Sequence, residues 1–186
     1  MRGDAELRKH VEKRLSYLYT GESMAVVSFI IVSFLLNKAY PQLQLYSLAS
    51  FWLSFFLLEL LLVQGSIYWY SKWRRLKSEN TSVTPIRMVQ RLKKVQKWNI
   101  GLIIVPPFMF VIDFLQWYPS LPIGGLTISG FIYLFAILEY INYFHIQLSY
   151  DNYSDIRYLL KSKRLKQACL SKDFERVEGS KWNQRS

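Results

Sequence analysis

Positive charge is confined to three blocks of this chain, and that segregation constrains the fold more than any other feature. Twenty-three of the 24 lysine and arginine residues lie in the segments 2–14, 72–97 and 157–185, and Lys38 is the only one outside them. The stretches between the blocks are nearly uncharged and rich in large apolar and aromatic side chains. Long apolar stretches flanked by basic segments are typical of integral membrane proteins.

Four apolar stretches are long enough to cross a bilayer, which takes about 20 residues of helix. They occupy the segments 21–40, 46–70, 98–117 and 126–147. Each span is expected to be helical because backbone amides are not left unpaired in lipid, and the continuous apolar runs exclude a barrel. We therefore predict one all-α domain, 1–186, a polytopic integral membrane protein with four transmembrane helices in a bundle.

The connections between the spans predict its orientation. The short connections 38–45 and 118–125 contain prolines, and the second also contains a Gly-Gly pair, a combination typical of turns. They carry a single basic residue, and the positive-inside rule places the three basic blocks on the cytoplasmic side. We expect a multi-pass protein of the cell (plasma) membrane, with both termini, the loop 71–97 and the tail 150–186 in the cytoplasm.

Two basic segments have the apolar spacing of amphipathic cytoplasmic helices. Ile86, Val89, Leu92 and Val95 recur at helical intervals in the loop, and a similar pattern follows residue 156 in the tail. Such helices either lie on an anionic leaflet or pack against their own bundle or a partner, and the sequence favours neither. The candidate contacts for anionic headgroups are Arg74, Arg75, Arg91, Lys93, Lys94, Lys161, Lys163 and Arg164.

Ionisable and strongly polar residues inside the spans are candidate site residues, because such groups are costly in lipid. Their positions place Glu59 near the midplane, Asp113 in the outer third and Glu139 in the inner half of the membrane. Lys38, at the outer end of the first span, is the only lysine or arginine in these segments and is assigned to the outer loop. Glu59 and Glu139 are therefore expected to be uncharged unless they face water, a cation or a base. The candidate ion, proton or interhelical polar site comprises Glu22, Glu59, Asp113, Glu139, Asn142 and His145.

The fourth span carries the clearest polar face. Glu139, Asn142, His145 and Ser149 fall within about a third of a helix circumference. This face either accepts protons or cations, or it makes hydrogen bonds between helices.

The third span carries Asn99, Pro106 and Asp113 at intervals of seven residues, so all three are expected on one face. Pro106 and Pro107 lack amide donors and free the carbonyls of the residues four positions earlier. A helix interrupted in this way either lines a cavity or contains an inert kink.

The second span aligns Trp52, Glu59 and Ser66, a line expected to face protein because Glu59 is costly against acyl chains. Gly65 is expected to allow the close approach of a neighbouring helix.

Motifs that would indicate catalysis are missing from the sequence. There is no His-Glu-x-x-His pair, no Gly-x-Ser-x-Gly elbow and no phosphate-binding glycine loop. His10 and His145 lie on different segments, and Cys169 is the only cysteine, so we expect no metal, no cofactor and no intrachain disulfide. The net charge of +11 is assigned to topology and lipid headgroups rather than to nucleic acid, since no nucleic-acid-binding motif accompanies it.

Three functional classes remain open. The preferred hypothesis is a non-enzymatic accessory or regulatory subunit of a membrane complex, with a protein partner or a second copy of the chain. The alternative is a small carrier or channel for protons or cations that uses the intramembrane carboxylates. The third is a membrane enzyme acting on lipid headgroups.

Overall fold

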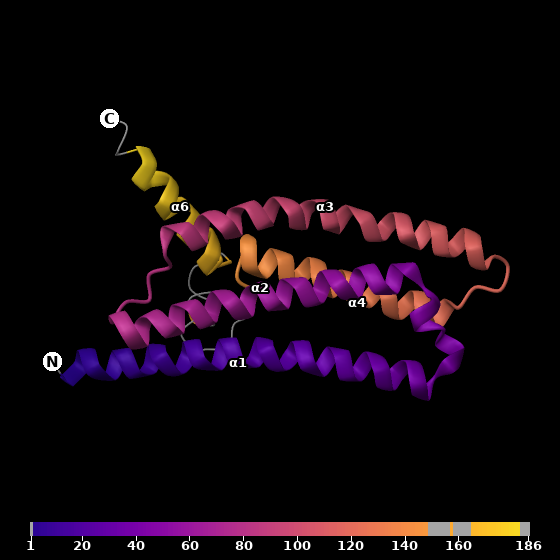
Figure 1. Cartoon of the computed structure of the whole chain (residues 1–186), viewed down its shortest axis with the longest axis horizontal. Coiled ribbons are helices and arrows are strands. Elements are labelled where there is room, and N and C mark those ends of the chain that lie inside the picture. Colours follow the sequence, from indigo (N-terminus) through magenta and orange to yellow (C-terminus); the bar gives the residue numbers. More distant parts are fainter. Residues whose placement is uncertain (1, 149–156, 158–164, 183–186) are drawn as a thin grey trace.

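The computed structural model describes residues 2–148, 157 and 165–182, and every long element in this part of the chain is a helix (Figure 1). The long helices are α1 (Arg2–Ala39), α2 (Ala49–Glu79), α3 (Ile86–Trp117) and α4 (Ile123–Phe144), and a shorter helix, α6 (Cys169–Trp182), follows. Two 3₁₀ turns, η1 (Pro41–Leu43) and η2 (Leu45–Ser47), join α1 to α2. Four helices are long and apolar enough to cross a membrane, which confirms the predicted number and type of apolar segments.

The helix boundaries differ from the predicted spans mainly where the chain is basic. α1 begins far before residue 21, and α2 continues past residue 70. α3 joins the predicted loop helix and the third span into one helix, because no glycine or proline lies between Ile86 and Trp98 and the basic residues there are good helix formers. The break between α2 and α3 falls at Asn80, which is left-handed with φ of 55°, a conformation that asparagine tolerates.

Helix α2 lies at the centre of the arrangement and packs against α1, α3 and α4. The amino terminus, the α2–α3 connection and α6 lie at one end of the molecule, which we call the basic end (Figure 1). The connections 40–48 and 118–122 lie at the other, which we call the loop end (Figure 1). α1 and α4 flank α2, and side chains such as Phe29 and Phe135, with ring centroids 5.9 Å apart, meet across the gap between them.

The loop end is closed by a compact apolar core formed by Leu45, Leu48 and Phe51. The predicted connection 118–125 is present but ends earlier, at Pro122, because Gly124 and Gly125 lie in the first turn of α4. A Cβ atom at Gly125 would lie 2.0 Å from the carbonyl oxygen of Leu43. The glycines therefore allow the α1–α2 connection to pack directly on the backbone of α4.

The proline pair of α3 lies inside a continuous helix. The Tyr133 hydroxyl on α4 donates a hydrogen bond of 2.8 Å to the carbonyl oxygen of Ile103, the acceptor that Pro107 leaves without its usual amide donor. This contact satisfies the freed carbonyl and supports the interpretation of an inert kink.

Helix α6 packs on α3 and α4 at the basic end. Its residues Leu170, Phe174 and Val177 join the main apolar core together with Val89 and Leu92 of α3. Burial of each such side chain contributes about 2 kcal/mol. The apolar stripe predicted in the loop is therefore covered, at Val89 and Leu92, by the chain itself.

Asp173 anchors α6 through its carboxylate. It accepts hydrogen bonds from the hydroxyls of Tyr68, at 2.8 Å, and Thr84, at 2.6 Å. Lys72 and Arg176 each place a nitrogen 3.2 Å from it. Burial opposes ionisation of this carboxyl, but the Thr84 hydrogen bond, the Lys72 charge and the Tyr68 hydrogen bond outweigh that cost, so the pKa of Asp173 is lowered.

Candidate functional site

A cavity of about 500 Å³ lies toward the basic end, between α1, α2 and α4. α1 lines it from Val11 to Phe29, α2 from Leu62 to Lys72, and α4 from Phe135 to Phe144. Residues 166 and 168–170 line the end nearest α6. The volume is in the range of pockets that hold small molecules.

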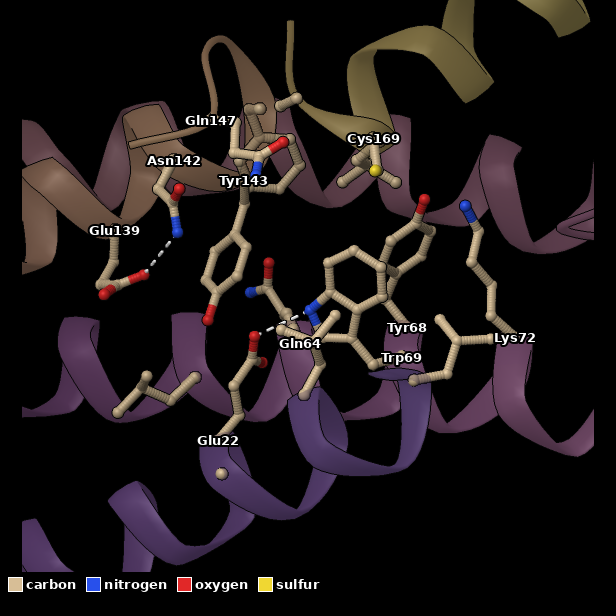
Figure 2. A pocket seen from close by; sticks show the side chains of 18 of the residues that line it. Glu22, Gln64, Tyr68, Trp69, Lys72, Glu139, Asn142, Tyr143, Gln147 and Cys169 are labelled. Carbon is tan, nitrogen blue, oxygen red and sulfur yellow. Dashed lines mark hydrogen bonds between the residues drawn. The ribbon is translucent and has the colours of Figure 1, made fainter. Parts of the chain in front are cut away.

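Two carboxylates from different helices line this cavity, Glu22 on α1 and Glu139 on α4. Glu22 accepts a hydrogen bond of 2.8 Å from the indole nitrogen of Trp69, and Glu139 accepts one of 3.3 Å from the amide of Asn142. Figure 2 shows the Tyr143 hydroxyl pointing between the two carboxyl groups. Within the part of the chain that the structure describes, neither carboxylate forms an ion pair with a lysine or arginine.

Gly65 makes this convergence possible. A Cβ atom there would lie 2.1 Å from Oε2 of Glu22 and 2.7 Å from the hydroxyl oxygen of Tyr143. Any side chain at Gly65 would therefore displace both groups. The expectation that Gly65 permits close approach agrees with this packing.

Oε2 of Glu22 is buried and has no well-aligned donor among the described residues, although the Tyr143 hydroxyl interacts with this carboxyl group. The other oxygen accepts a hydrogen bond from Trp69, so the carboxylate is fixed in orientation with Oε2 near Tyr143. A buried carboxylate oxygen without a donor is costly unless it carries a proton or meets a cation. Glu22, Glu139 and Tyr143, which we call the acidic node, can therefore hold a proton or bind a positive group.

Asp113 lies elsewhere and has a structural role. It is buried in α3 at the loop end, where it accepts hydrogen bonds from the backbone amides of Ala49, at 3.1 Å, and Ser50, at 2.8 Å. These amides begin α2, whose own N-cap residue, Leu48, supplies no side-chain cap. Asp113 therefore caps α2 from a different helix, where negative charge also favours the helix dipole.

The predicted face of α3 is confirmed, since Asn99, Pro106 and Asp113 are all buried. Asn99 exchanges two hydrogen bonds with Gln64 of α2, of 2.8 and 3.1 Å. Both polar residues of this face thus connect α3 to α2.

Glu59 does not join the acidic node. Both of its carboxylate oxygens are buried and lack a hydrogen-bond partner in the described part of the chain, but the residue does not line the cavity. The line through Trp52, Glu59 and Ser66 does not face protein throughout, because Trp52 is 48% exposed. Ser66 does meet α1, where its hydroxyl lies 2.5 Å from that of Ser23.

The predicted polar face of α4 is wrong beyond Asn142. The helix ends at Phe144, so the exposed His145 lies past its last residue and outside the acidic node. Ser149 lies outside the described residues. The chain turns here because Asn142 accepts a hydrogen bond of 2.8 Å from the Leu148 amide, which replaces a continued helix.

The predicted headgroup contacts divide into three groups. Arg75 pairs with Glu79, and Lys93 pairs with Glu178 of α6. Arg74, Arg91 and Lys94 are exposed at the basic end, and Lys161, Lys163 and Arg164 lie outside the described residues. Residues 2–148, 157 and 165–182 contain no group of three or more side chains placed to hold a metal ion.

Sequence reasoning missed Tyr143, Trp69 and Gln64 as parts of the polar lining. Tyr143 follows Glu139 by four residues and therefore shares its helix face, a spacing that is visible in the sequence. Trp69 has no comparable signal in its local sequence. Its contact with Glu22 joins positions 47 residues apart and depends on how α1 packs against α2.

Comparisons with models of protein families, with curated proteins and with solved structures give no match to this chain. The function is therefore argued from the acidic node and its cavity.

Proposed function

We propose that this chain is a small multi-pass membrane protein that binds a proton or a cation at the acidic node, as a carrier or channel does. The observation that supports this proposal is the convergence of Glu22 and Glu139 on Tyr143 beside a cavity. Ionisable groups inside a membrane segment are costly and usually mark ion or proton pathways. This function was the second of the three classes inferred from the sequence.

The orientation belongs to the same proposal. The basic end faces the cytoplasm of a cell membrane, because the excess of lysine and arginine lies there. Both termini are then cytoplasmic, and the acidic node lies in the inner half of the membrane.

The acidic node binds one positive charge at a time, either a proton or a cation. Two nearby carboxylates in a site of low polarity favour retention of a proton by one of them, and an incoming cation displaces that proton. Trp69 and Asn142 keep the carboxylates oriented through this exchange because their donors remain in place whichever charge is bound. Exchange of a proton for a cation is the elementary step of coupled transport.

The test is pH-driven flux in proteoliposomes. Glu22→Gln and Glu139→Gln should each reduce flux to the level of protein-free vesicles while the protein remains monodisperse. Glu59→Gln is the matched control, since Glu59 lies in α2 outside the cavity, and its flux should equal that of the unchanged protein. Flux that persists in both node variants would contradict the proposal.

A second proposal keeps the partner hypothesis, and it is favoured by the environment of α1. Only 6% of the most apolar window of α1 is buried within the chain, against 44% for α2. Its exposed residues include Val27 and Ile31, which would face a partner helix or a second copy. In mild detergent, Ile31→Trp should release a stoichiometric companion, whereas Val111→Trp, on the exposed side of α3, should not. A chain that purifies as a monomer without a companion would overturn this proposal.

A third proposal concerns the membrane surface. Arg74, Arg91 and Lys94 are exposed at the basic end and would contact anionic headgroups. Binding of the chain in nanodiscs to anionic vesicles should weaken as salt is raised, because polybasic attraction is screened. Binding that does not change with salt would contradict it.

A further inference from the structure

We propose that the ligand of the cavity is a compact organic cation with an apolar body, which enters sideways from the membrane leaflet between α1 and α4. This inference rests on the proposed function and specifies the class of cation.

The walls of the cavity divide by chemistry along its length. On the loop-end side of the acidic node they are apolar, with Ala25 and Phe29 on α1, Leu62 on α2 and Phe135 on α4. Toward the basic end the lining includes the positively charged Arg14, Lys72 and Lys166. Among the described lining residues the acidic ones are Glu22 and Glu139, and they separate this apolar part from a basic part nearer α6. A ligand complementary to this arrangement has one positive group and an apolar body beside it.

Aromatic side chains strengthen this match. Trp69 and Tyr143 lie at the node, and Phe29 and Phe135 lie beyond it. Aromatic faces attract organic cations, and they do so more strongly when the site is dry. A small hydrated metal ion would leave most of the 500 Å³ unfilled, whereas a drug-sized cation fills it.

The route of entry follows from which lining residues are exposed. Tyr17 on α1 is 68% exposed and Phe135 on α4 is 41% exposed, and the exposed Gly21 lies beside Glu22. All three line the cavity, so it is open along the gap between α1 and α4. That gap faces acyl chains in the proposed orientation.

The basic end is covered in part by the chain, and the exposed Ser82 and Cys169 line the cavity there. The Gln147 amide donates to the Lys166 carbonyl at 2.8 Å, and the Ala168 amide donates to the His145 carbonyl at 3.1 Å. The buried residues Ala168 and Leu170 lie against the cavity beneath these bonds. A cation that arrives from water at the basic end passes the positive charges of Arg14, Lys72 and Lys166, which repel it. A cation that partitions into the leaflet enters beside lining residues that carry no positive charge.

Binding of radiolabelled tetraphenylphosphonium to the purified full chain in detergent tests this inference. Tetraphenylborate has the same shape and the opposite charge, so it serves as the matched ligand control. The unchanged protein should bind the phosphonium saturably and at least about tenfold more tightly than the borate. The double variant Glu22→Gln, Glu139→Gln should lose that preference.

Access is tested by a side chain at Gly21, where an added Cβ meets nothing within 4 Å. Gly21→Phe should weaken phosphonium binding by about tenfold or more. Gly101→Phe on α3 is the control, because an added Cβ there also meets nothing and Gly101 does not line the cavity. Equal binding by the two variants would overturn the lateral route.

The outcomes separate this inference from the proposed function. Flux of protons or sodium that depends on Glu22 and Glu139, without phosphonium binding, would overturn the organic-cation inference and leave the function standing. If neither carboxylate-dependent flux nor phosphonium binding is observed, both the proposed function and the organic-cation inference are overturned. Saturable phosphonium binding that disappears in the carboxylate variants supports both.

Discussion

The two ends of this molecule use buried carboxylates in opposite ways. At the loop end, Asp113 accepts two backbone hydrogen bonds at the start of α2 and lies in a closed apolar core. Toward the basic end, Glu22 keeps one oxygen without a well-aligned donor among the described residues, shares the Tyr143 hydroxyl with Glu139 and lines a cavity with it. A costly group inside an apolar helix is therefore not functional by position alone, because its hydrogen-bonding partners and its access to a cavity together decide the role.

The largest expected effect comes from removing the acceptor at the loop end. Asp113→Ala leaves the buried amides of Ala49 and Ser50 without partners, and each such loss costs about 1–3 kcal/mol. We expect the thermal unfolding midpoint in detergent to fall steeply, because α2 packs against the other three long helices. Asp113→Asn keeps one acceptor oxygen and should lose about half as much stability. An unchanged midpoint for Asp113→Ala would contradict the capping role.

A smaller effect is expected at the glycine beneath the acidic node. Gly65→Ala places a Cβ atom against Glu22 and Tyr143, and overpacking of this kind costs about 1–3 kcal/mol. Cation binding should fall together with stability, unlike at Asp113, where binding should fall only as the protein unfolds. Gly101→Ala is the control and should be neutral or slightly stabilising, because its site is open and alanine favours helix. Full cation binding by Gly65→Ala would show that the node does not need this packing.

The third prediction tests whether the hydrogen-bonding partners of a carboxylate, rather than the end of the molecule at which it lies, determine its role. Asp173 lies at the basic end, yet its carboxylate is surrounded by donors, and its pKa is lowered from the ordinary value of 3.8. Its stabilising contribution is therefore complete above pH 3.8 and is lost as the pH falls below that value, through the lower pKa of the folded state. Amide hydrogen exchange of α6 should accelerate over this range.

At neutral pH, Asp173→Asn should accelerate the same exchange by the equivalent of about 1–2 kcal/mol while leaving cation binding intact. Glu175→Gln, at an exposed position of the same helix, is the control. Loss of cation binding in Asp173→Asn would place this carboxylate in the site and remove the distinction between partnered and available groups.

The sequence was sufficient to predict the four apolar helices, because apolar length is a local property. It also placed Asn99, Pro106 and Asp113 on one buried face, since seven residues complete about two helical turns. It did not identify the donors to Asp113, which lie 63 and 64 residues away and follow from the packing of α2 on α3. Depth along the helix correctly separated Asp113 from Glu139, but it did not reveal which group lacked partners.

Two further features depended on tertiary contacts that no local pattern contains. α6 forms in a polar segment because Leu170, Phe174 and Val177 find a core on α3 and α4. The end of α4 at Phe144 depends on Asn142, whose side-chain oxygen accepts a hydrogen bond from the Leu148 backbone amide. Both features shape the cavity, so its existence was not predictable from the spans.

Infrared difference spectroscopy tests the central contrast most directly, because it reports which carboxyl groups change when a cation binds. Sodium and tetraphenylphosphonium would be added in turn to the reconstituted protein, with and without ¹³C-labelled aspartate. We predict a carboxyl signal that disappears in the Glu22→Gln, Glu139→Gln variant and does not move with the aspartate label. A signal that moves with labelled aspartate, or that persists in the glutamate variant, would contradict the account.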